Sequence, residues 1–259
     1  ELGPESPAAL AGLGSLKLDL KDFSEARQLL EKASILAPDA LEPQVNLVLV
    51  ALGQTRHADA LDMFMLQNET WRKSSLASEI HASILDGKSR ENLLNSNFEE
   101  AEQYARAALE KNPRLGTAWF NLGQVLRVHG DWEDAIEAYE SAAQYTEGDI
   151  SGQVAAWLTL PILYSSQHEI ERARAHYCAG LDSLVRDFEV DGLQELKPAL
   201  EAASHRTNFQ LAYQQEDDLV LQKQYGQWVS SVLAREFDGV APRQDLRRGR
   251  IRVGFISSY

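Results

Sequence analysis

The sequence predicts an all-α fold, a right-handed solenoid of about five helical hairpins with capping helices and one short C-terminal strand. Apolar residues recur with a period of about 34 residues, and each period holds two stretches of helical periodicity separated by a short turn signal. A hairpin of this size cannot bury its apolar face alone, so the recurrence indicates a stack of neighbours. The chain is 44% hydrophobic and 25% charged, which is typical of a globular protein.

The clearest hairpin is expected over residues 116–149. Its first helix carries Trp119 and, four residues later, Gly123, while its second helix carries Ala135 and Tyr139. The two small residues would let antiparallel helices approach closely, and Tyr139 would fill the next gap. This combination of spacing and residue size resembles the tetratricopeptide repeat.

Each expected hairpin has an alanine at the same place in its second helix. These alanines are Ala26, Ala60, Ala101, Ala135 and Ala173. The step from Ala60 to Ala101 is 41 residues, so about seven residues are inserted within 75–97, which predicts a longer helix or a loop. In the first hairpin Lys17 replaces an aromatic residue, so this helix is expected to pack less well or to form an exposed end. In the fifth, Pro161 replaces the glycine and should kink the helix that carries Trp157, Leu160 and Tyr164.

The pattern fades towards the C-terminus. Residues 192–214 and 216–236 have helical periodicity, and Ile251–Ile256 is a β-branched apolar run that predicts a strand. We therefore expect a repeat solenoid over 1–184, a helical linker or capping region over 185–241, and a basic linker with the first strand of a further domain over 242–259.

A second resemblance lies in this C-terminal part. Asn208–Tyr213 and Arg250–Ser258 are similar to the junction in the O-linked N-acetylglucosamine transferase family, where repeats lead into the first strand of a GT-B catalytic domain. The resemblance implies a nucleotide-sugar donor and serine or threonine acceptors. Because the chain starts at Glu1 and stops at Tyr259, we expect a fragment cut at both ends. The fragment should be inactive, with no catalytic residue of its own and nucleotide sugar bound only in the missing domain.

Composition excludes several other classes of function. The formal net charge of −14 would repel a phosphate backbone, so no nucleic-acid partner is expected. The single cysteine allows no internal disulfide, which favours a reducing, cytoplasmic location. No run of about 18 apolar residues is present, so no membrane association is expected. The histidines have no metal-ligand spacing, and neither a metal nor a cofactor is predicted.

Candidate binding residues lie on the first helices of the hairpins. Asn121 and Gln124 fall outside the apolar stripe, and Asn46 occupies the place of Asn121 two hairpins earlier. This side lines the concave face in tetratricopeptide solenoids, so we expect Asn121 to be exposed. The transferase resemblance implies an asparagine ladder that hydrogen-bonds an extended peptide, a task suited to amides because they both donate and accept. The alternative is that asparagine is merely tolerated there. Arg127 is the one candidate for binding a carboxylate.

Two functions remain open on the sequence alone. The first is a scaffold that binds polypeptides and presents them to a downstream glycosyltransferase domain. The second is a free-standing adaptor that assembles protein complexes and has no enzymatic domain. Both require a polypeptide partner, and they differ in whether a catalytic domain comes after residue 259.

Overall fold

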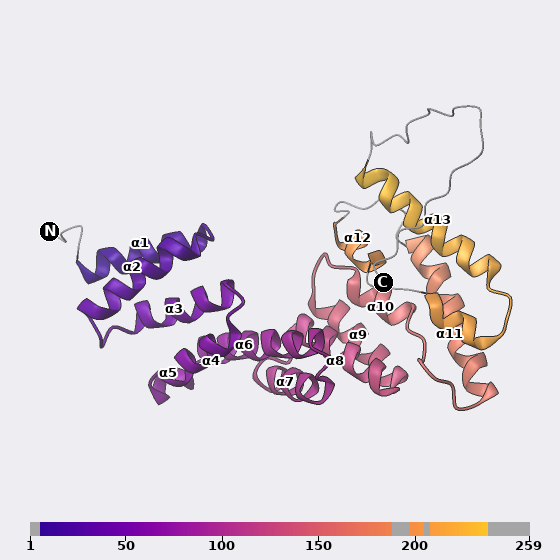
Figure 1. Ribbon diagram of the computed structural model, residues 1–259, viewed down its shortest axis with the longest axis horizontal. Helices are drawn as coiled ribbons and strands as arrows, with labels where there is room; N and C mark the ends of the chain where they lie inside the picture. The colour runs from indigo at the N-terminus through magenta and orange to yellow at the C-terminus, as the bar shows by residue number, and fades with distance from the viewer. Residues whose placement is uncertain (1–5, 188–196, 205–207, 238–259) are drawn as a thin grey trace.

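The computed structural model describes residues 6–187, 197–204 and 208–237 of the 259-residue chain. In these residues all regular structure is helical, and successive helices follow the long axis of the molecule (Figure 1). The helices are α1 (Pro7–Asp19), α2 (Phe23–Leu36), α3 (Leu41–Gly53), α4 (His57–Met65), α5 (Glu69–Arg72), α6 (Ser75–Leu94), α7 (Phe98–Lys111), α8 (Gly116–His129), α9 (Trp132–Tyr145), α10 (Ser151–Trp157), α11 (Gln167–Asp187), α12 (Lys197–Ser204), the 3₁₀ helix η2 (Asn208–Gln214) and α13 (Leu219–Glu236).

The helices of the described chain pair into five successive hairpins, α1/α2, α3/α4, α6/α7, α8/α9 and α10/α11, each in contact with the next. The two C-terminal helices then pack on the last hairpin, α13 against α11 and α12 against α10. The predicted solenoid of helical hairpins is therefore confirmed. The strand expected over 251–256 lies outside the described residues.

The small and large residues that predicted the hairpins are buried together. The five alanines of the second helices are each 0% exposed, and Tyr139 and Tyr177 are also 0% exposed. A Cβ added to Gly123 would lie 2.7 Å from Cε1 of Tyr139, so the tyrosine ring occupies the space that the glycine leaves. Close packing between small and large residues thus sets the spacing between the two helices.

The inserted residues lengthen α6. This helix has 20 residues, whereas α1 has 13, and both end four residues before the next helix begins. The additional turns therefore lie at the start of α6, next to the short helix α5. The expected longer helix is confirmed, but Asp86 and its neighbours belong to the regular part of the repeat.

The fifth hairpin departs most from the pattern. Its first helix, α10, ends at Trp157, because the ring of Pro161 would clash with the carbonyl four residues earlier in a continued helix. The prediction that this helix continues through Leu160 and Tyr164 is therefore wrong, although Leu160 is buried. The freed carbonyls find other donors. Thr159 Oγ1 donates to Ala155 O at 2.6 Å, and His176 Nε2 lies 2.8 Å from Ala156 O.

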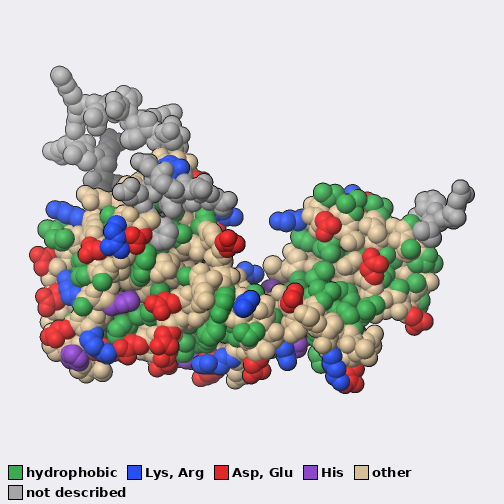
Figure 2. Space-filling view, turned by 180° about the vertical axis from the view of Figure 1, so that it is seen from behind, with side chains coloured by type: hydrophobic (Ala, Val, Ile, Leu, Met, Phe, Trp, Pro, Cys, Tyr) green, Lys and Arg blue, Asp and Glu red, His purple; other side chains and the backbone are tan. Residues whose placement is uncertain are grey.

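The first hairpin forms a poorly covered end, as expected. Leu13 is 43% exposed, whereas Leu122, at the same place in the fourth hairpin, is 3% exposed. Leu16 and Leu20 are exposed as well, and Figure 2 shows hydrophobic side chains gathered over this end of the molecule. None of the helices in the described part of the chain combines the length and apolar character needed to cross a membrane.

Candidate functional site

A cavity of about 330 Å³ is lined by the first helices of three hairpins, α6, α8 and α10, with further residues from α9, the loop after it and α12. We call it the central groove. A Cβ on Gly152 would lie 2.7 Å from the Ala143 backbone nitrogen, so this glycine lets α10 approach α9 and close one side of the groove. The lining residues are Asp86, Arg90, Leu93, Leu94, Gly116, Thr117, Phe120, Asn121, Gln124, Ala142, Thr146, Asp149, Ser151, Gly152 and Glu201.

A carboxylate held from two sides lies in the central groove. Thr117 Oγ1 donates to Asp86 Oδ2 at 2.7 Å, and Asn121 Nδ2 donates to Asp86 Oδ1 at 2.8 Å. The two donors are four residues apart on α8 and so share one face of that helix. Burial raises the pKa of the Asp86 carboxyl, and the hydrogen bonds from Thr117 and Asn121 act in the opposite direction. The result is a carboxylate of fixed orientation in a partly dehydrated site.

The expectation that Asn121 is exposed is wrong. Its side chain is 5% exposed and its amide nitrogen is engaged with Asp86. The sequence argument placed it correctly outside the apolar stripe of α8, but a carboxylate from α6 covers that side of the helix. Asn121 therefore has a structural partner, and it also remains part of the groove lining.

Of the other three predicted site residues, one lines the central groove and two do not. Gln124 is half-buried and lines the groove one turn after Phe120. Asn46 is half-buried on α3, and Arg127 is half-buried near the end of α8, but neither lines this cavity. Within the described residues, the Arg127 Nε is buried and has no hydrogen-bond partner.

Sequence reasoning missed Asp86, Thr117 and Phe120. The available signal was that Asp86 alone is acidic at its place in the repeat, where the first two hairpins have Ala11 and Val45. The long first helix hid this correspondence, because the inserted turns obscure where its repeat begins.

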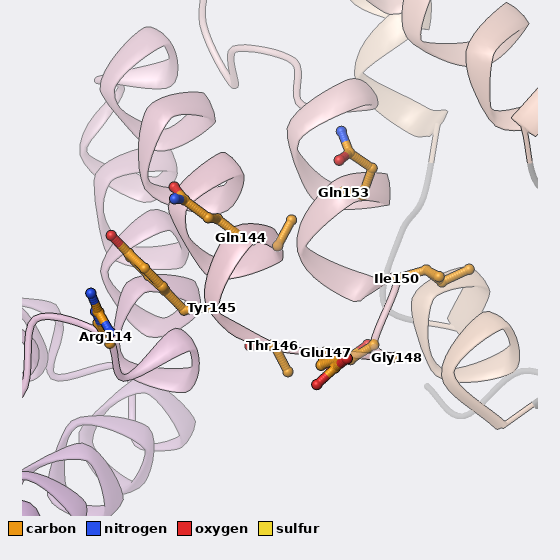
Figure 3. Close-up of a pocket in the computed structure, with 10 residues that line it drawn as sticks. Arg114, Gln144, Tyr145, Thr146, Glu147, Gly148, Ile150 and Gln153 are labelled. Atoms are coloured by element: carbon orange, nitrogen blue, oxygen red, sulfur yellow. The ribbon is translucent and has the colours of Figure 1, made fainter.

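A larger and more open depression, of about 690 Å³, shares Thr146 and Asp149 with the groove. Figure 3 shows its lining, with Gln144 and Tyr145 at the end of α9 and Gln153 on α10. Its charged residues Arg114 and Glu147 are exposed and stay hydrated. Asp149 Oδ1 accepts a hydrogen bond from the Ser151 backbone nitrogen at 2.8 Å, so it is engaged at the start of α10. The lining of this depression does not include Asp86, Thr117 or Asn121, the hydrogen-bonded group of the central groove.

Comparison with known proteins agrees with the repeat architecture. A family model described as tetratricopeptide repeat matches residues 92–150, which span the end of α6 through α9. The chain aligns with PilF of Pseudomonas aeruginosa at a TM-score of 0.50 and 15% identity, covering 78% of this chain and 83% of that one. The chain therefore carries a tetratricopeptide-repeat region, and the likeness to PilF concerns the fold alone.

One curated relative carries a functional name. Over 170 residues the chain is 26% identical to the human protein O-mannosyl-transferase TMTC1, a match that covers 52% of this chain. The matched part spans only 19% of the length of that relative.

Proposed function

We propose that this chain is a polypeptide-binding scaffold whose central groove holds an extended segment of a partner protein. The observation that carries the proposal is the groove itself, in which apolar side chains of α6 and α8 lie together with a few fixed polar groups. Leu93 and Phe120 offer apolar contact, and Gln124 offers both a donor and an acceptor for a peptide backbone. Pockets that combine apolar surface with a small number of placed polar groups are typical of binding sites.

We further propose that the bound polypeptide is presented to a glycosyltransferase domain of the same protein. Two independent similarities support this role. Residues 205–259 resemble the junction of repeats and catalytic domain in the O-linked N-acetylglucosamine transferase family, and the curated relative is named a protein O-mannosyl-transferase. Both similarities concern enzymes that attach a sugar to a protein, so a peptide groove beside the catalytic domain would select the acceptor.

A pair of exposed leucines allows a direct test of the groove. Leu94 is 81% exposed and lines the groove, whereas Leu66 is 84% exposed at the end of α4, away from it. Binders would be selected from a phage-displayed library of random twelve-residue peptides and measured as labelled synthetic peptides by fluorescence anisotropy. Leu94→Arg should weaken binding about tenfold by placing a hydrated charge at the edge of the groove. Leu66→Arg is the matched control and should leave the affinity unchanged.

Failure of the library to yield any binder, or equal effects of the two substitutions, would contradict the proposed groove. The transferase role needs a separate measurement, because a free-standing adaptor would bind the same peptides. The intact mass of the natural protein, purified from its source, decides between them. A mass that leaves no room for a catalytic domain after the repeats would favour the adaptor.

A further inference from the structure

We infer that Asp86 is the recognition group for a cationic side chain, arginine or lysine, of the polypeptide in the central groove. The inference rests on the proposed peptide-binding function and adds a chemical class of ligand to it. It would make the scaffold selective for segments that carry a basic residue in register with this hairpin.

The first reason is that, within the described residues, no ion pair neutralises the charge of Asp86. Its two hydrogen-bond donors, Thr117 and Asn121, are both neutral. Arg90, one turn further along α6 and also in the groove lining, and His57 attract this carboxylate without forming an ion pair with it. A carboxylate has about four acceptor positions, and two are occupied here. The remaining positions suit the parallel N–H donors of a guanidinium or the three donors of an ammonium group.

The second reason is the fixed geometry of the carboxylate. One donor holds each carboxylate oxygen, at 2.7 Å and 2.8 Å, and both donors come from α8 while Asp86 comes from α6. The carboxyl plane is therefore set before a ligand arrives, which lowers the conformational entropy lost on binding. A single surface aspartate without such support would gain little from a charged partner.

The third reason is the composition of the rest of the lining. Leu93, Phe120 and Ala142 provide apolar surface against which the methylene stem of a long basic side chain can pack. The charged residues of the lining comprise three carboxylates, from Asp86, Asp149 and Glu201, and one guanidinium, from Arg90. Lys197, outside the lining, forms an ion pair with Glu201 at 3.8 Å, so the remaining groups leave a net negative charge. This balance favours a cation over an anion. A volume of about 330 Å³ accommodates one long side chain with its adjoining backbone.

The test uses a set of fluorescein-labelled twelve-residue peptides built from Ala, Gly, Ser and Val that differ only at one central residue, which is Arg, Lys, citrulline or Glu. Citrulline keeps the shape of arginine and removes its charge. We expect the Arg and Lys peptides to bind about tenfold more tightly than the citrulline peptide, and the Glu peptide to bind most weakly. Asp86→Asn should lower the affinity for the Arg peptide to that for the citrulline peptide.

Glu79→Gln is the matched control, because Glu79 is an exposed carboxylate on the same helix and outside the groove, so this variant should keep the preference. If Asp86→Asn folds poorly, titrating wild-type protein with the Arg and citrulline peptides while following the Asp86 carboxyl carbon by NMR gives the same information. A shift of that carbon by the Arg peptide alone supports the inference. Nα-acetyl-argininamide is a further probe, and an affinity equal to that of the Arg peptide would assign the site to small cations and overturn it.

Equal binding of the Arg and citrulline peptides would overturn the inference and leave the peptide groove intact. An Asp86→Asn variant that keeps the preference would have the same consequence. Absence of binding by all four peptides would overturn both the inference and the groove, so the two failures are distinguishable.

Discussion

The hairpins α1/α2 and α3/α4, here called the N-terminal half, correspond to the hairpins α6/α7 and α8/α9, called the central half. In the N-terminal half α2 begins at Phe23 and α4 at His57. In the central half α7 begins at Phe98 and α9 at Trp132, in both cases 75 residues later. The turns correspond as well, because Lys21 and Ser96, also 75 residues apart, have φ angles of 58° and 61°. The two pairs of hairpins are thus two versions of one backbone unit.

The side chains of these two units differ most where the first helices of neighbouring hairpins face each other. At the place of Asp86 the N-terminal half has Ala11, and at the place of Thr117 it has Glu42. Asn46 and Asn121 correspond, and the amide nitrogen of Asn121 donates to a carboxylate of the neighbouring hairpin, Asp86, whereas the residue at that place beside Asn46 is Ala11. The buried small and large residues determine the backbone, whereas the facing side chains are free to acquire a binding function in one half only.

The largest expected effect tests whether the two halves share their packing. Ala60 and Ala135 are both 0% exposed. Replacing either by leucine should destabilise the protein by up to about 3 kcal/mol, because added methylenes cannot be accommodated without moving a helix. Urea unfolding would measure both variants. A large loss for one and almost none for the other would show that the halves do not pack alike.

The next effect separates the two asparagines. Asn121→Ala removes a donor from a partly buried carboxylate and should cost about 1.5 kcal/mol. Asn46→Ala is the matched control, since Asn46 is half-buried and has Ala11 where Asn121 has Asp86, and should cost under about 0.5 kcal/mol. Equal losses of unfolding free energy would mean that the bond to Asp86 contributes nothing.

A pair of glycines should respond with opposite sign. A Cβ on Gly12 of α1 would meet nothing within 4 Å, so Gly12→Ala should stabilise the helix by about 0.5–1 kcal/mol. A Cβ on Gly87 of α6 would lie 2.2 Å from Cδ2 of the buried His57, so Gly87→Ala should destabilise by about 1 kcal/mol net. Thermal melting of the two variants checks the signs, and a further His57→Ala change should relieve the Gly87→Ala clash.

Much of the fold follows from the sequence because it depends on local periodicity and residue size. The alanines of the second helices and the inserted turns of α6 are of this kind. Pro161 signalled a disturbed helix, but the contacts of Thr159 and His176 with the carbonyls at its end could not be read from the repeat spacing. The candidate site was harder to predict, because Asp86 and Asn121 are 35 residues apart and no spacing rule joins them. The place of Asp86 in the repeat was also difficult to recognise, because Lys88 and Ser89 replace the leucine and glycine that the repeat pattern expects there.

The smallest expected effect is on the pH dependence of the unfolding free energy. Asp86 contributes to this dependence in the central half, whereas Ala11, at the same place in the N-terminal half, has no titrating group. Burial raises the pKa of this carboxyl above its ordinary value of 3.8, so the folded protein holds the proton more tightly than the unfolded chain does. Its contribution to stability is therefore greatest below pH 3.8, falls as the pH rises through the folded-state pKa, and is constant above it.

Asp86→Asn and Asp86→Ala both remove the titrating group, and the second installs the residue found at the corresponding place of the first hairpin, Ala11. Relative to wild type, the unfolding free energy of both variants should rise with pH across this window and then level off. Urea unfolding over a series of pH values would measure the difference. If both curves run parallel to that of wild type, Asp86 has the same pKa in the folded and unfolded chains, and burial in the central groove does not raise it.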